Sequence, residues 1–198
     1  FDLSLGLVNA PRSITNAGGT TTVSDSEYYL GMGNGVAGKI GEKFYFGLTG
    51  AGVSGLGVDF SSTVLPANSS IVTTKSLFKI APALAFKLND KLSVGASVQF
   101  GYQTLALKNP QFAMPQTGEF GVGAAIGAIY HITPNVQAGV SYTTKTNISE
   151  YKFNGRVGTT EGSYNLDMDA PSSFAIGIAV RPMPKLLVEA DAKWYGFS

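Results

Sequence analysis

The sequence contains no cysteine, a single histidine and little charge. Without cysteine the chain can form neither disulfides nor thiolate metal sites, and its dispersed carboxylates provide no ligand cluster, so we expect no metal and no cofactor. Charged residues make up 14% of the 198 residues, against about 25% in soluble globular proteins. The net charge is +1, with Lys and Arg scattered singly, which disfavours nucleic acid as a partner.

Long hydrophobic runs are also absent. No stretch of the roughly 18 consecutive apolar residues that a membrane-spanning helix needs occurs in the sequence. A β-strand, by contrast, can cross a membrane with about 9 to 11 residues. The missing runs therefore exclude a transmembrane helix and leave a transmembrane barrel possible.

Alternation between apolar and small or polar residues is the strongest pattern present. Residues 79–102, KIAPALAFKLNDKLSVGASVQFGY, form two alternating strands that meet at Asn89-Asp90-Lys91. Successive side chains of a strand point to opposite faces, so each strand has one apolar face. Such a face packs either on a second sheet in a soluble sandwich or on lipid in an outer-membrane barrel.

The same alternation recurs along the whole chain and predicts about nine strands, at residues 2–14, 21–40, 43–60, 70–88, 91–108, 118–132, 135–150, 162–181 and 185–197. Tight turns at 41–43, 89–91, 133–135 and 182–185 alternate with longer polar connections at 15–22, 61–70, 109–117 and 151–162. Short turns at one rim and long loops at the other are typical of transmembrane barrels. We predict an all-β fold with a single domain, residues 1–198, that forms part of an antiparallel up-and-down transmembrane β-barrel.

The rows of side chains on the two faces of each strand indicate that the apolar face packs on lipid rather than on a second sheet. One face of the strand near residue 125 carries Phe120, Val122, Ala124, Ile126, Ala128 and Tyr130. Aromatic residues near strand ends, such as Phe44, Tyr102, Tyr130, Tyr142 and Trp194, are placed as in the aromatic girdles of barrels. Charged residues such as Lys79 and Glu189 lie on the opposite faces and fit a wet lumen, whereas a soluble sandwich would use the aromatic residues as its core.

The sequence gives little support for the hypothesis that the protein is an enzyme. The one histidine, His131, lies at a short turn and has no second acid-base group placed with it. The glycine-rich stretches at 31–35 and 47–52 lie inside strand patterns rather than between a strand and a helix, so they do not indicate a nucleotide-binding loop.

Three segments carry a resemblance to a known family: the hairpin at 79–100, the segment YHITPNVQAGVSYTTK at 130–145, and the ending RPMPKLLVEADAKWYGFS at 181–198. Together with FGLTGAGVSGLGVDF at 46–60, they resemble the FadL family of outer-membrane transporters for long-chain fatty acids and other hydrophobic compounds. The resemblance extends over nearly the whole chain and implies a bacterial outer-membrane location.

The resemblance also implies an architecture. Family members have a 14-stranded barrel, an N-terminal hatch that plugs the lumen, and a kinked third strand that opens the barrel wall. On this basis we expect an internal piece that starts at the first strand and ends in the ninth, without the hatch and about five further strands.

Site residues follow from the resemblance. It places the wall opening at Gly52, Val53, Ser54 and Gly55, although a glycine-rich strand end can also be a simple bend. A substrate groove among the loops would contain apolar loop residues, which could equally fold the loops over the barrel mouth. These are Leu56, Val64, Leu65, Pro66, Phe112, Met114 and Pro115.

Three lysines are the candidate lumen cations. Lys75, Lys79 and Lys193 are on inward-facing positions and could bind a carboxylate head group. The alternative is that they pair with Glu119, Glu189 and Asp191 across the lumen.

The predicted function is uptake of long-chain fatty acids or other hydrophobic compounds across the outer membrane. Its steps would be capture by the loops, binding in the lumen and lateral release into the membrane lipid through the third strand. A general water-filled porin or a structural barrel is the alternative. The long connections are rich in Ser, Thr, Gly and Asn with apolar islands, which favours the transporter.

Overall fold

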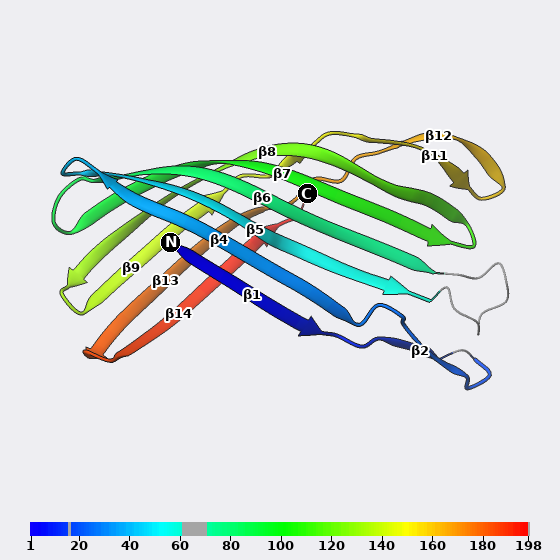
Figure 1. The fold of residues 1–198 in the computed structure, drawn as a ribbon, viewed down its shortest axis with the longest axis horizontal. Coiled ribbons are helices and arrows are strands. Elements are labelled where there is room, and N and C mark those ends of the chain that lie inside the picture. Colours follow the sequence, from blue (N-terminus) through cyan, green and yellow to red (C-terminus); the bar gives the residue numbers. More distant parts are fainter. Residues whose placement is uncertain (16, 61–70, 198) are drawn as a thin grey trace.

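The protein folds into one large curled antiparallel sheet, with a separate two-stranded hairpin beside it (Figure 1). The computed structural model describes residues 1–15, 17–60 and 71–197, apart from the side chain of Leu56. The regular elements of these residues are all strands, and they include no helix long and apolar enough to cross a membrane.

Nine strands make up the main path of the sheet, and each pairs with its neighbour in an antiparallel ladder. In spatial order they are β1 (Asp2–Asn9), β4 (Tyr28–Ile40), β5 (Phe44–Asp59), β6 (Val72–Lys87), β7 (Leu92–Asn109), β8 (Phe112–Thr133), β9 (Val136–Thr143), β13 (Ser172–Met183) and β14 (Leu186–Gly196). The predicted all-β, up-and-down arrangement of about nine strands is confirmed.

Five shorter strands lie off this path. A small hairpin of β2 (Ser13–Thr15) and β3 (Thr21–Val23) connects β1 to β4. The connection from β9 to β13 holds β10 (Asn147–Ile148), β11 (Tyr151–Val157) and β12 (Thr160–Leu166), and β10 and β11 pair with β8. We call residues 144–171 the inserted segment.

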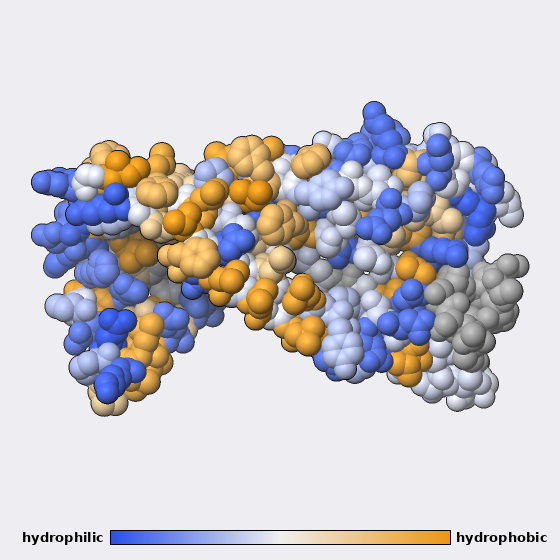
Figure 2. All heavy atoms as spheres, in the orientation of Figure 1, coloured by the Kyte–Doolittle hydropathy of each residue, from blue (hydrophilic) through white to orange (hydrophobic). Residues whose placement is uncertain are grey.

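The outer face of the sheet is apolar and carries aromatic residues at two levels. Tyr102 and Phe120 have ring centroids 4.8 Å apart, and Phe44 and Phe86 form a pair at 4.7 Å near the tight turns. On β8, Phe120 and Tyr130 are ten residues apart, which at about 3.4 Å per residue and a strand tilt of about 45° corresponds to roughly 24 Å along the membrane normal. Figure 2 shows hydrophobic side chains gathered over one stretch of the sheet, with polar ends beyond it. This pattern matches a lipid-facing band.

The buried core lies on the inner face, beneath the inserted segment. Leu77 of β6, Leu105 of β7 and Met114 of β8 are 2–4% exposed and pack against side chains of the inserted segment. The partners are Ile148, Tyr151, Phe153 and Ala170, with Leu107, Phe112, Tyr164, Leu166 and Met168 at the margin. The segment thus covers the inner face of the sheet toward the long-loop end.

Several predicted boundaries are wrong. The expected strand at 2–14 stops at Asn9, and the expected strand at 162–181 is divided into β12 and β13 between Leu166 and Ser172. The expected loop at 109–117 is only a turn between β7 and β8, because both strands continue to Asn109 and Phe112. The expected strand at 135–150 stops at Thr143, where the inserted segment begins. Residues 151–162, expected as a loop, contain β11 and the start of β12. At 109–117 and 151–162, polar residues that suggest a loop are paired in strands, because the core under the inserted segment gives them a buried partner.

Candidate functional site: a lumen trough, a hydrogen-bonded lysine and a break in the wall

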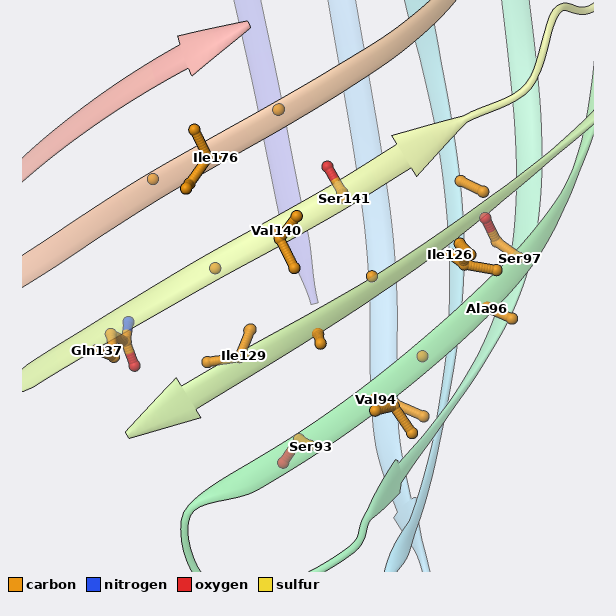
Figure 3. Close-up of a pocket in the computed structure, with 18 of the residues that line it drawn as sticks. Ser93, Val94, Ala96, Ser97, Ile126, Ile129, Gln137, Val140, Ser141 and Ile176 are labelled. Atoms are coloured by element: carbon orange, nitrogen blue, oxygen red, sulfur yellow. The ribbon is translucent and has the colours of Figure 1, made fainter. Parts of the chain in front are cut away.

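A trough of about 590 Å³ runs along the inner face beside the tight-turn end of the sheet. Its labelled lining residues come from four neighbouring strands, β7, β8, β9 and β13 (Figure 3). The inner-face members are mostly small: Ala83, Ala85, Ser93, Gly95, Ser97, Ala125, Gly127, Gly139, Ser141, Ala175, Gly177 and Ala179, with Ile129, Gln137, Glu189 and Asp191. The strands leave room here because most of these inward residues are Gly, Ala or Ser, whose side chains extend at most one atom beyond Cβ.

Lys79 lies between the trough and the inserted segment. Its ammonium donates hydrogen bonds to Oε1 of Gln99 at 2.8 Å and to Oγ1 of Thr146 at 2.7 Å. Gln99 is the next inner residue of β7 after the trough residue Ser97, and Thr146 is fully buried in the inserted segment. Both partners are neutral, and within the part of the chain that the structure describes no carboxylate forms an ion pair with this ammonium.

Two further hydrogen bonds hold the inserted segment on the sheet. The amide nitrogen of Gln103 donates to the carbonyl of Met168 at 3.0 Å, and the hydroxyl of Tyr151 donates to the carbonyl of Gln103 at 3.3 Å. Gln103 and Tyr151 are both 0% exposed. Because both residues are buried, breaking either bond would leave a polar group without a partner and would cost free energy.

The ends of the inserted segment are joined to each other by charge. Lys145 forms an ion pair with Asp169 at 2.6 Å, and the backbone N–H of Ile148 donates to the same carboxylate at 2.7 Å. Burial raises the pKa of Asp169, but the bonds from Lys145 and Ile148 outweigh it and leave this pKa below its ordinary value. The hydrogen bond to Asp169 raises the pKa of Lys145.

The Lys145–Asp169 contact makes the inserted segment sensitive to acid. Asp169 stabilises the segment fully above its unfolded pKa of about 3.9, and this stabilisation is lost as the pH falls through the lower folded value. Lys145 stabilises it below an unfolded pKa of about 10.4 and loses its effect as the pH rises through the higher folded value. We expect hydrogen exchange at the Ile148 amide, corrected for its intrinsic rate, to accelerate below about pH 4.

Asp169→Asn provides the control for this prediction. The variant should exchange faster at neutral pH than the natural protein and should show no acid transition. An acid transition of unchanged size in Asp169→Asn would contradict the assignment.

The wall of the sheet has a break between β4 and β5. These strands pair from Ile40–Phe44 to Gly33–Ala51, and the ladder goes no further, although β4 continues to Tyr28 and β5 to Asp59. The β5–β6 ladder shifts register between Gly52 and Ser54, which leaves Val53 as a bulge. We call residues 28–32 and 52–56, which face each other without pairing, the ladder break.

The residues predicted for the wall opening all lie at this break. Gly52, Val53 and Ser54 form the bulge, and Gly55 follows it. A Cβ added at Gly55 would meet no atom within 4 Å. The bend therefore has space beside it, and whether substrate leaves there stays a prediction.

The residues predicted for the loop groove are dispersed. Val64, Leu65 and Pro66 lie outside the described residues, and Leu56 lies in β5 with a side chain that is also outside them. Phe112, Met114 and Pro115 are in strand β8 rather than in a loop, so their expected placement is wrong. Met114 is buried under the inserted segment, and Phe112 packs against Phe153 with ring centroids 5.9 Å apart.

The three predicted lumen lysines lie on two strands and do not form one site. Lys79 hydrogen-bonds to Gln99 and Thr146 as described above, and Lys75 lies nearer the start of the same strand. Lys193 is on β14, with its ammonium 5.0 Å from the centroid of the Tyr195 ring. The ion pairs of the described residues are Lys87–Asp90 and Lys145–Asp169, so the alternative pairing of these lysines with Glu119, Glu189 and Asp191 is not seen.

The residues that hydrogen-bond to Lys79 could not be identified from the sequence. Gln99 and Thr146 appear as ordinary polar residues in the sequence, and their roles depend on the inserted segment reaching the inner face of β7. The inner glycines Gly121 and Gly123 were the available signal, because they leave the space that Ile148 and Thr146 fill.

The sequence profile of the family described as outer membrane protein transport protein (OMPP1/FadL/TodX) matches residues 33–198. The chain belongs to this family. Its members are bacterial outer-membrane β-barrels that transport hydrophobic compounds and are not enzymes. Among curated proteins, no sequence matches the chain significantly.

Solved structures with a similar fold include the toluene transporter TodX of Pseudomonas putida, with 17% identity, a TM-score of 0.76, and coverage of 96% of this chain and 60% of that one. The toluene transporter TbuX of Ralstonia pickettii has 19% identity and a TM-score of 0.73, covering 96% and 61%. A FadL homologue of Pseudomonas aeruginosa has 14% identity and a TM-score of 0.74, covering 98% and 58%. The chain thus spans about three fifths of each of these structures, and at these identities the likeness concerns the fold.

Proposed function

We propose that this protein takes up long-chain fatty acids or similar amphiphiles from the outside, binds them in its lumen and releases them sideways into the lipid of the outer membrane. The observation that carries the proposal is the ladder break between β4 and β5, where both strands continue but their ladder stops at Gly33–Ala51. Unpaired strand edges are costly in lipid. We infer that an unpaired edge retained at this cost serves the function of the barrel.

The position of Lys79 connects the trough to the break. Its β5 neighbour is Ala51, the last residue of the β4–β5 ladder, and its β7 neighbour is Gly101. A carboxylate held by this ammonium would have its acyl chain along the small-residue trough and its head group beside the break. Because the hydrogen-bond partners of Lys79 are neutral, its positive charge can pair with a substrate that carries a negative charge.

The general-porin alternative has less support. A water-filled pore selects ions by rings of charged side chains, whereas the inner face of the trough is mostly Ala, Gly and Ser. Such a surface suits an apolar chain better than a hydrated ion.

Lys79→Met tests the head-group assignment. It keeps the stem of the side chain and removes the charge, so binding of a long-chain fatty acid should weaken by roughly 10- to 100-fold, the equivalent of a charged hydrogen bond of about 1.5–3 kcal/mol. Binding of the fatty alcohol of equal chain length should change little. The measurement is displacement of a fluorescent fatty acid from the purified protein.

Lys87→Met is the matched control, because Lys87 pairs with Asp90 at the tight-turn rim. It should bind both ligands like the natural protein. Equal weakening of acid and alcohol in Lys79→Met would show that Lys79 does not read the carboxylate. Uptake of toluene without any binding of fatty acid would replace the proposed substrate class by aromatic hydrocarbons.

A further inference from the structure

The carbonyl of Gly57 marks the end of the ladder break farther from the tight turns. Gly57 lies in β5 beyond the bulge and is buried. A backbone carbonyl that faces a strand edge needs a donor, since burying it unpaired is costly. In the continuous part of the β4–β5 ladder the donors are backbone N–H groups, and β4 supplies none here.

Side chains take over this role. The Nη1 of Arg12 donates to the Gly57 carbonyl at 3.0 Å. The hydroxyl of Tyr29 also contacts this carbonyl and lies 3.0 Å from the carbonyl of Ser26. Arg12 precedes the β2–β3 hairpin and Tyr29 is near the start of β4, so two separate parts of the chain converge on one atom of β5.

The next residues of β5 are held in the same way. The N–H of Asp59 donates to Oγ of Ser24 at 2.9 Å, and the N–H of Asp25 donates to the carbonyl of Asp59 at 2.8 Å. Ser24 is 2% exposed. From Gly57 onward β5 is therefore bonded to Tyr29 and to residues that precede β4. The stretch at 52–56, which lies outside the β4–β5 ladder, has an extended length of about 17 Å at 3.4 Å per residue.

We propose that Arg12 and Tyr29 are positioning residues that keep the wall open by holding β5 at Gly57 away from the edge of β4. The inference rests on the proposed lateral release. Without these donors, the Gly57 carbonyl must find another one, and the nearest free set is the backbone edge of β4. Re-pairing of β5 with β4 would then close the break, as a ladder extends wherever two edges meet.

The test is the pair Arg12→Met and Tyr29→Phe, which removes both donors and retains most of the packing. In cells that express the natural gene with these changes, uptake of a labelled long-chain fatty acid should fall at least fivefold. Cysteines placed at Leu30 and Gly55, on the outer face on either side of the break, should form a disulfide faster than in the parent. A purely structural role would leave this cross-linking rate unchanged or lower it.

Tyr130→Phe is the control, because the Tyr130 side chain is 45% exposed on the outer face of β8, away from the break. It should change neither uptake nor cross-linking. Unchanged uptake and cross-linking in a folded double variant, judged by heat-modified gel mobility, would overturn the inference. Tyr29→Phe alone, which loses one hydroxyl, gives the same two readouts if the double variant does not fold. Uptake that persists when Leu30 and Gly55 are disulfide-linked would overturn the lateral route itself, whatever the two anchors do.

Discussion

A disulfide across the ladder break is expected to reduce uptake of a long-chain fatty acid at least tenfold. Leu30→Cys and Gly55→Cys place the two sulfurs on the outer face of β4 and β5 where no ladder joins these strands. A disulfide requires Cα atoms within about 7 Å, so its formation draws the strands together and closes the opening. Uptake should return when the bond is reduced, and the measurement is accumulation of labelled fatty acid in oxidised and reduced cells.

Val36→Cys with Leu48→Cys is the matched control. These residues face each other across the same two strands, but within the continuous ladder. Their disulfide should leave uptake unchanged. If oxidation of the Leu30–Gly55 pair also left uptake unchanged, substrate would have to leave the barrel by another route.

The second large effect is expected at Gly121. A Cβ added there would lie 2.6 Å from the carbonyl of Asn147 and would also meet the side chain of Ile148. Because backbone atoms cannot give way cheaply, Gly121→Ala should push the inserted segment off β8 at a cost of roughly 1–3 kcal/mol. Trypsin cleavage within the segment, at Lys145, Lys152 and Arg156, should become about 5- to 100-fold faster.

Gly139→Ala is the control for this variant. Gly139 is also on the inner face, but its added Cβ would meet only the carbonyl of Ala128, at an ordinary 3.8 Å. Cleavage of this variant should match that of the natural protein. Equal cleavage of the Gly121 and Gly139 variants would mean that the segment is not seated on Gly121.

The repeated strands were predictable because alternation is a local property. Each outer row, such as Phe120 to Tyr130, can be read from every second residue, and the tight turns at 41–43 and 89–91 have short polar sequences between such rows. The bulge at Val53 was predictable only through the family resemblance. Its glycines fit a bend equally well.

The inserted segment was not predictable in this way. Residues 144–171 combine short strands with polar residues, and their position depends on distant partners: Thr146 reaches Lys79, and Met168 reaches Gln103. Such contacts between residues more than 60 positions apart have no periodic signature. For the same reason, Arg12 and Tyr29 could not be linked to Gly57 before the fold was known.

The central claim is that substrate leaves the lumen through the ladder break. A photoreactive amino acid at Ser54, which lies at the bulge opposite the inner residue Leu77, tests it most directly. During uptake of a labelled long-chain fatty acid, illumination should attach label both at this position and at a second probe in the trough, Ser97, and excess unlabelled fatty acid should suppress both. Label at Ser97 with none at Ser54 would show that substrate binds in the lumen but does not leave through the break.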